Sequence, residues 1–312
     1  MERLRITSSC WDFSGVYSMP DDPAPPGCRY IDMKNVTGSR SYCDDEAAGR
    51  IFEVMKNEPH GSIHYIDTGS YHYLTWFFLH EVQPGNAGGG IVHEVQSDNV
   101  DGGIVHEVQP GNAGGGFVLV VFDNHTDMQP PAFEGLLSCG GWIIRALQDI
   151  PSLCGALVIG PDEEAIAAAD ESAAQKVRFL SRERLAAWRS ADSFNENFCG
   201  SFEKWVRKEL ADLRQKYGAS AVYLSVDKDI LSEEYARTSW SQGETSNEEL
   251  AFMVRSVLHA SQDYGMSFTG ADVCGESEPE DTYGCTLGRK TNLMLHRLFT
   301  EFCISASGPA QS

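Results

Sequence analysis

The most constraining feature of the sequence is residues 117–127, which read Phe-Val-Leu-Val-Val-Phe-Asp-Asn-His-Thr-Asp. A continuous apolar run rich in Val and Phe is typical of a strand buried on both faces, as in the centre of a parallel sheet. The residues that follow it include Asp123, His125 and Asp127, whose side chains bind divalent metals. Alternate positions of an extended backbone point the same way, so this strand end predicts a cation site.

A second stretch has the same form, because residues 221–226 predict a buried strand that ends in Asp227 and Asp229. Other strands are predicted to end near Asp12 and to span 62–66, 156–159, 177–180 and 267–273, with helices between them. This alternation predicts an α/β fold of three layers, with a mostly parallel central sheet and helices on both faces. The carboxyl ends of parallel strands share one edge, where such folds bind ligands.

The acids at these two strand ends, together with His125, indicate a metal centre and not a set of turns. Several carboxylates in one crevice repel one another and raise one another's pKa values, and divalent cations remove that conflict. A ligand set rich in oxygen, with imidazole and without thiolate, favours Mn²⁺ over structural zinc. Each motif taken singly is equally compatible with caps and loop turns, but the two together favour a pair of cations.

These motifs resemble the three metal motifs of the arginase/agmatinase (ureohydrolase) family, in the family's order, with Gly69-Ser-Tyr-His72 as the first. The resemblance implies an arginase-like fold, two Mn²⁺ per chain, and hydrolysis of a linear C–N bond in a guanidino or amidino compound by a metal-bridging hydroxide. It implies metal ligands at His72, Asp123, His125, Asp127, Asp227 and Asp229. Asp123 and Asp227 would bridge the ions, and Asp127 would also accept a hydrogen bond from the hydroxide.

The resemblance implies that Glu276 pairs with the guanidinium of the substrate, although a loop acid before a proline is also compatible with plain exposure to water. Two departures from the family are visible. The loop that carries a family histidine reads Leu-Ser-Cys-Gly-Gly-Trp at 137–142, so Cys139 is either a substitute proton donor or a small buried residue. The segment 242–245 also differs from the family's Gly-Gly-Leu-Thr loop, which puts arginine in doubt as substrate.

Composition narrows the class of partner. The formal net charge of −21 argues against nucleic acids and anionic membranes, and is compatible with a small cationic substrate. Residues 1–6 have no apolar core of signal-peptide length, and the longest apolar runs are too short to span a bilayer. The 9 cysteines are scattered and form no C-x-x-C pair, which is typical of reduced thiols in the cytoplasm. Self-association into a homo-oligomer is left open.

The sequence predicts a single domain over 1–312 with one insertion. Residues 80–92, 93–105 and 106–118 are copies of one 13-residue unit that begins His-Glu-Val-Gln. Joining residue 79 to 106 would still connect a helix through a glycine-rich loop to the strand at 117, so 80–105 is interpreted as a tandem expansion. A period of 13 matches none of the common solenoid repeats, and glycine-rich tracts usually act as connectors, so an exposed excursion is favoured.

Three functions are compatible with these features. The first is the manganese-dependent hydrolase, and the second is a catalytically weak or inactive metal-binding relative with a binding or regulatory role, which the missing loop histidine favours. A deacetylase-like amide hydrolase is a third candidate, but it normally needs a His-His pair, which this chain lacks.

Deletion of residues 80–105 should leave the fold and the metal content intact, because the third repeat restores the same connection. Circular dichroism and elemental analysis of the deletion variant would test this. Loss of metal binding in a folded variant would show that the expansion contributes to the metal centre.

Overall fold

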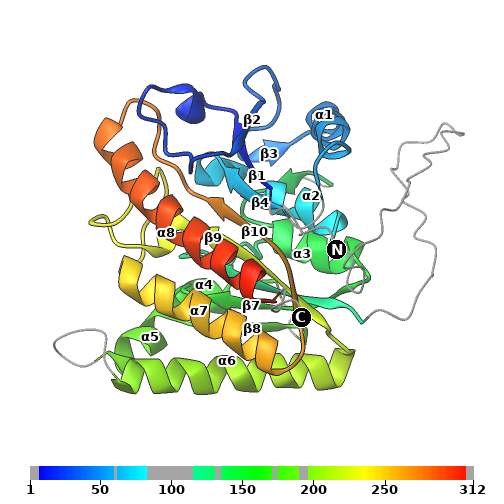
Figure 1. Cartoon of the computed structure of the whole chain (residues 1–312). Helices are drawn as coiled ribbons and strands as arrows, with labels where there is room; N and C mark the ends of the chain where they lie inside the picture. Colours follow the sequence, from blue (N-terminus) through cyan, green and yellow to red (C-terminus); the bar gives the residue numbers. More distant parts are fainter. Residues whose placement is uncertain are drawn as a thin grey trace, which may run out of the picture.

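The computed structural model describes residues 7–59, 62–82, 115–130, 135–170, 172, 175–189 and 196–306. An eight-stranded sheet with the order β2-β1-β4-β10-β9-β5-β7-β8 runs through its centre (Figure 1), and every strand pair in it is parallel. Its strands are β1 (Ser8–Asp12), β2 (Arg29–Asp32), β4 (Ile63–Ile66), β5 (Phe117–Phe122), β7 (Leu153–Ile159), β8 (Val177–Leu180), β9 (Ala221–Asp227) and β10 (Ser267–Cys274). A short antiparallel pair joins β3 (Tyr42–Cys43) to β6 (Leu137–Ser138).

Helices cover both faces of the sheet, as expected from the sequence. One face packs against α1 (Asp45–Met55), α2 (Leu74–His80) and α3 (Trp142–Asp149). The other packs against α5 (Arg182–Trp188), α6 (Glu196–Tyr217), α7 (Asn247–Asp263) and α8 (Thr282–Ala306). Between β7 and β8 lies the short helix α4 (Glu163–Ala167), which buries no side chain. The expected three-layer α/β fold is therefore confirmed.

Strand β5 shows why its sequence has no polar alternation. Val118, Val120 and Phe122 pack into the core on the α6 and α7 side. Phe117 and Val121 pack into the core on the α2 and α3 side. A central parallel strand has no solvent face, so every position of β5 is buried and must be apolar.

The structure differs from the expected elements in one helix and adds others. The alanine-rich, acidic sequence of residues 163–174 predicts an exposed helix, but helix α4 ends at Ala167. The strands β2 and β3 and the helix α5 are additional elements that the hydrophobic pattern did not predict. The repeats, which begin at His80 in the last turn of α2, lie outside the described residues from 83 to 114, so the expected excursion stays a prediction.

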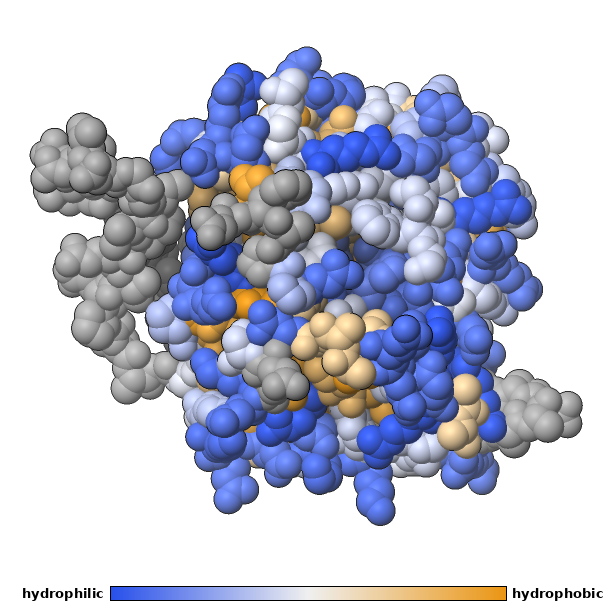
Figure 2. All heavy atoms as spheres, turned by 180° about the vertical axis from the view of Figure 1, so that it is seen from behind, coloured by the Kyte–Doolittle hydropathy of each residue, from blue (hydrophilic) through white to orange (hydrophobic). Residues whose placement is uncertain are grey.

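The surface is largely polar. Figure 2 shows the face behind Figure 1 as mostly hydrophilic, with hydrophobic side chains in small separate patches. Within the described ranges the exposed large hydrophobic residues are Tyr30, Tyr42, Trp240 and Tyr283. None of the helices in these ranges is long and apolar enough to cross a membrane.

His64 is a buried histidine of the sheet that lies away from the strand ends. Its ring stacks on Phe78 with centroids 3.9 Å apart, and its Nδ1 lies 2.9 Å from Ser9 Oγ. Burial, with a smaller contribution from the charge of Arg29, lowers the pKa of His64 to about 3. The imidazole is therefore neutral in the folded protein under conditions that protonate it in the unfolded chain.

The His64→Phe variant should unfold with a weaker dependence on pH than the wild type. The stabilisation from the neutral imidazole is complete above the unfolded pKa of 6.5 and is lost as pH falls toward 3. Between pH 7 and about 5.5, protonation of His64 in the unfolded chain should lower the unfolding free energy of the wild type by about 1 kcal/mol. The variant has no imidazole at this position and should not show this loss. Urea unfolding at both pH values measures the difference, and equal losses would contradict it.

Candidate metal centre

The candidate site lies where the neighbouring strands β5 and β9 end. Phe122 and Val226 are register partners in this parallel pair, so the next residues, Asp123 and Asp227, follow at the same level of the sheet. Both carboxylates are almost completely buried, at 1% and 3% exposure. The register of β5 and β9 therefore places the two carboxylates next to each other, as expected from their shared sheet edge.

The predicted extended geometry of residues 123–127 is wrong. The chain bends after β5, and Asp127 has a left-handed backbone with φ of 48°. The bend still brings the Asp127 carboxylate to the site, where its Oδ2 accepts a hydrogen bond of 2.6 Å from Trp142 Nε1. Likewise, a 3-10 turn (η4, Lys228–Ile230), and not a straight strand, presents Asp229. The left-handed backbone of Asp127 is uncommon for a residue other than glycine, although aspartate adopts it more readily than most residues.

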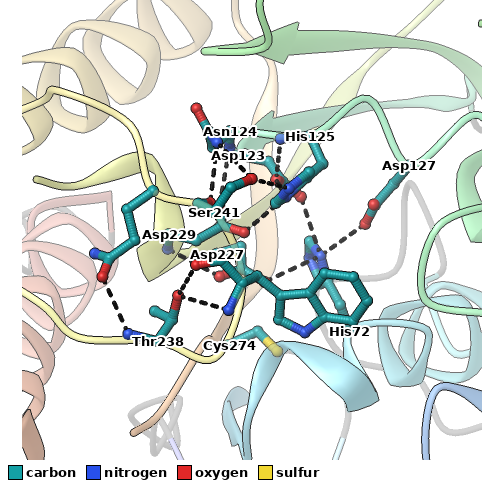
Figure 3. Close-up of polar contacts among 12 residues, drawn as sticks. His72, Asp123, Asn124, His125, Asp127, Asp227, Asp229, Thr238, Ser241 and Cys274 are labelled. Atoms are coloured by element: carbon teal, nitrogen blue, oxygen red, sulfur yellow. Dashed lines mark hydrogen bonds and ion pairs between the residues drawn. The ribbon is translucent and has the colours of Figure 1, made fainter. Parts of the chain in front are cut away.

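His72 reaches the same place from the segment after β4. It follows the 3-10 turn η2 (Gly69–Tyr71) and is 1% exposed. Its Nδ1 lies 2.8 Å from Asp127 Oδ2, 3.2 Å from Asp123 Oδ2 and 3.6 Å from Asp227 Oδ2. The structure therefore brings the sequence-predicted His72 together with three of the predicted carboxylates (Figure 3).

His125 and Asp229 form the other half of the cluster. His125 Nδ1 lies 2.8 Å from Asp229 Oδ2 and 3.5 Å from Asp123 Oδ1. The side chain of His125 is 29% exposed, so this half is the one open to solvent. Figure 3 shows these side chains converging with Asp227 and His72, so all six predicted ligands meet in one place.

The donor atoms fit divalent cations. The ligand atoms of His72, Asp123 and Asp227 lie within 4.8 Å of one another, as do those of Asp123, His125 and Asp229. Ligands that share one octahedral cation with bonds of about 2.1 Å lie about 3 Å apart. Because Asp123 belongs to both groups, its two oxygens can serve two neighbouring cations.

The second nitrogen of each histidine is held by a serine that the sequence analysis missed. His72 Nε2 lies 2.9 Å from Ser225 Oγ, and Ser225 Oγ donates a 2.6 Å hydrogen bond to Asp272. His125 Nε2 lies 2.8 Å from Ser241 Oγ. Such partners fix the ring orientation and leave Nδ1 available for a metal. Ser225 lies in the predicted strand 221–226, two residues before Asp227, which was a usable signal, and Ser241 had none.

Backbone amides orient the ligand carboxylates. Asp123 Oδ1 accepts a hydrogen bond of 2.6 Å from His125 N, and Asp227 Oδ1 accepts one of 3.0 Å from Asp229 N. Asp229 Oδ1 accepts a bond of 3.0 Å from Asn124 N. Gly275, with φ of 84°, allows the β10 end to pass close by, since a Cβ there would lie 2.3 Å from Asp227 Oδ1.

The buried carboxylates of the cluster repel one another, so added positive charge would stabilise them. Burial, and then the charges of neighbouring carboxylates, raise the pKa of Asp127 to about 6 and that of Asp229 well above its usual value. Burial would lower the pKa of His125, but its hydrogen bonds to Asp123 and Asp229 raise it to about 12. Positive charge on His72 and His125 therefore balances part of the carboxylate charge, and a bound cation would take over that role.

Cys139, the predicted substitute for the loop histidine, follows β6 and packs into the core beside α3. Burial, and then the charge of Asp127, raise the pKa of its thiol to about 12. The thiol therefore stays protonated at neutral pH and does not act as a thiolate. Its role as a proton donor stays a prediction.

Glu276, the predicted substrate anchor, is 0% exposed. Its Oε1 accepts hydrogen bonds from Tyr17 Oη at 2.8 Å and Asn292 Nδ2 at 2.7 Å, and its Oε2 lies 2.5 Å from Lys228 Nζ. A substrate cation would have to displace Lys228 to reach this carboxylate. The role of Glu276 as substrate anchor stays a prediction, and its internal ion pair with Lys228 argues against this role.

Comparison with known proteins finds one protein of similar sequence and several solved structures of similar fold. No protein-family model matches the sequence. An uncharacterized protein of Thermotoga maritima is 25% identical over 291 residues, which cover 93% of this chain and 88% of the relative.

Two solved structures are also similar. The agmatine ureohydrolase of Thermoplasma volcanium has a TM-score of 0.55 at 12% identity, covering 97% of this chain and 92% of its own. The formiminoglutamase of Trypanosoma cruzi, solved with Mn²⁺, has a TM-score of 0.51 at 13% identity, covering 90% and 78%. The arginase-like fold implied by the motifs is therefore confirmed.

Replacing a carboxylate predicted to bridge the two cations should abolish metal binding. We expect about two Mn²⁺ per chain in the wild type and loss of both in Asp123→Ala and Asp227→Ala, because each removes a shared ligand. Elemental analysis after dialysis measures the metal. Asp263→Ala, at an exposed surface carboxylate, is the matched control. Full metal content in either site variant would contradict the assignment.

Proposed function

We propose that this protein is a hydrolase of linear C–N bonds in amidino or guanidino compounds, with two Mn²⁺ per chain. The observation that carries the proposal is the pair of ligand groups that share Asp123 at the carboxyl edge of an arginase-like sheet. The two solved structures described above are named for hydrolysis of such compounds, agmatine in one and formiminoglutamate in the other. The fold and the donor set together support the same class of reaction.

The donor set also supports the choice of manganese. Four carboxylates and two imidazoles, with no thiolate, suit a hard divalent ion that also accepts nitrogen. The formiminoglutamase was solved with this metal. When bound, such a cation pair supplies a water that is acidic enough to act as a nucleophile at neutral pH.

Asp127 is suited to handle the proton in this reaction. Its Oδ2 accepts a hydrogen bond from Trp142 Nε1, which fixes the orientation of the carboxyl group. A carboxylate held in this position beside the candidate cation site can take up and release the proton of the reaction. Hydrolysis forms a C–O bond from water and breaks the C–N bond, and the leaving amine takes a proton that Asp127 or Cys139 would supply.

The alternative is a metal-binding relative without turnover that has a binding or regulatory role. The absence of histidine in the 137–142 loop and the internal ion pair of Glu276 favour it. In this case the metal would be retained and the chemistry lost. The two functions differ in turnover and not in metal content.

We further propose a small cationic molecule as substrate and a cytoplasmic location, without nucleic-acid or membrane partners. The charge of −21 favours a cationic ligand. The 8 cysteines among the residues with defined positions are free thiols, as is typical of reducing compartments. Homo-oligomerisation stays open.

A substrate screen should identify the activity. Mn²⁺-loaded protein is incubated with arginine, agmatine, guanidinobutyrate, guanidinopropionate and formiminoglutamate, and urea and ammonia are measured. We expect turnover of at least one compound, and a loss of kcat of about 100-fold or more in Asp127→Asn, because a proton-transfer group contributes that much. Asp263→Ala should retain wild-type activity.

The screen also separates the two proposals. Metal-loaded, folded protein that turns over none of the five compounds would favour the binding or regulatory role. Wild-type kcat in a metal-loaded Asp127→Asn variant would contradict the role of Asp127 while leaving the hydrolase intact.

A further inference from the structure

The carboxylate of Glu276 is neutralised inside the protein. Tyr17 and Asn292 donate hydrogen bonds to its Oε1, and Lys228 holds its Oε2 at 2.5 Å. Both members of this ion pair are 0% exposed. Helix α8 encloses the pair, since a Cβ at Gly288 would lie 2.7 Å from Glu276 Oε2 and 3.2 Å from Lys228 Nζ.

The neutralising cation comes from the metal motif itself. Lys228 lies between the ligands Asp227 and Asp229, and its side chain turns away from them toward Glu276. A substrate cation brought to Glu276 would face an ammonium at close range in a medium of low dielectric, which is unfavourable. A flat substrate cation that binds beside the metal ligands therefore needs a partner other than Glu276.

The loop of residues 231–245 provides a rigid frame at the open half of the site. Gly243 N donates to Asp229 O at 2.7 Å, and Asn124 Nδ2 donates to Ser241 O at 3.0 Å. Ser241 Oγ also contacts His125 Nε2 at 2.8 Å. Each of these bonds connects the loop to a metal-motif residue, so the loop has a defined position over the site.

Trp240 is the large side chain that this frame presents to solvent. Its indole is 40% exposed, and its ring centroid lies 5.9 Å from that of His125 with the planes at 73°. A Cβ at Gly69 would lie 2.8 Å from Trp240 Cδ1 and 3.2 Å from Asp227 Oδ2. The indole and the Asp227 carboxylate thus both pack closely against Gly69, an approach that a side chain at residue 69 would hinder.

The backbone of Trp240 is also fixed. Trp240 N donates to Thr238 Oγ1 at 3.3 Å, and Thr238 Oγ1 donates to Trp240 O at 3.1 Å. An indole held in place beside buried carboxylates, with part of its surface exposed, is preorganised to bind a flat cation by a cation–π contact.

We propose that the indole of Trp240, and not the carboxylate of Glu276, binds the flat cationic amidinium or guanidinium end of the substrate; this rests on the proposed hydrolase function. Trp240 is then a substrate-contacting residue that selects charge and planarity. The internal Lys228–Glu276 pair removes the competing site.

The test uses the full-length, Mn²⁺-loaded protein with agmatine and guanidinobutyrate as cationic probes, and their neutral ureido analogues as matched ligands. Trp240→Leu should weaken the Kd of a guanidine probe about 10-fold and that of its ureido analogue less than about 2-fold. Trp240→Phe, which keeps an aromatic face, should lose about 3-fold. Calorimetry measures Kd, and KM should change while kcat changes little for any probe that is turned over. Tyr30→Leu, at another exposed aromatic residue, should have no effect.

Four outcomes would overturn the inference. They are an unchanged guanidine Kd in Trp240→Leu, equal losses for charged and neutral ligands, no binding of either guanidine to the wild type, and a 10-fold or larger loss in a folded, metal-loaded Glu276→Gln variant. Turnover of a guanidine by the wild type together with any of the first two outcomes would leave the hydrolase proposal standing. If the predicted Trp240 effect is observed but the wild type turns over none of the compounds, the binding role of Trp240 stands and the hydrolase proposal is contradicted.

Discussion

The arrangement of this protein depends on holding several buried carboxylates within a few ångströms of one another. Asp123, Asp127, Asp227 and Asp229 are each at most 6% exposed, and their mutual repulsion opposes folding unless positive charge is present. Two imidazoles supply part of that charge, with His72 and His125 in direct contact with the acids. Divalent cations would supply the rest, which is why the site and the stability of the strand ends are physically coupled.

The sheet makes this arrangement attainable. Parallel register sets Asp123 beside Asp227, and the core on both faces of β5 and β9 prevents either strand from shifting. Serine hydroxyls hold the outer nitrogens of both histidines, so the rings are oriented before any metal arrives. Preorganisation of this kind lowers the cost of binding a cation and fixes where a substrate carbon must lie.

The segment of Asp227 and Asp229 also determines the state of Glu276. Lys228 lies between these two candidate ligands, and its ammonium forms an ion pair with the Glu276 carboxylate. The exposed aromatic residue over the open half of the site is Trp240. Proteins of one fold often change substrate through such loop and second-layer residues, because the metal ligands themselves tolerate little change.

Residue type and spacing were sufficient to predict the central buried strands, the three-layer α/β class and five of the six candidate ligands, because apolar runs and metal-binding side chains are local properties of the chain. His72 was predicted only from the resemblance to the ureohydrolase motifs. The same information failed for the bend at Asp127 and the 3-10 turn at Asp229, since ligand convergence there depends on backbone conformations that local patterns do not specify. It also could not reveal that Lys228 neutralises Glu276, or that Trp240 lies beside His125. Those contacts join positions far apart in the sequence, and they exist only because strand order and loop anchoring bring the segments together in space.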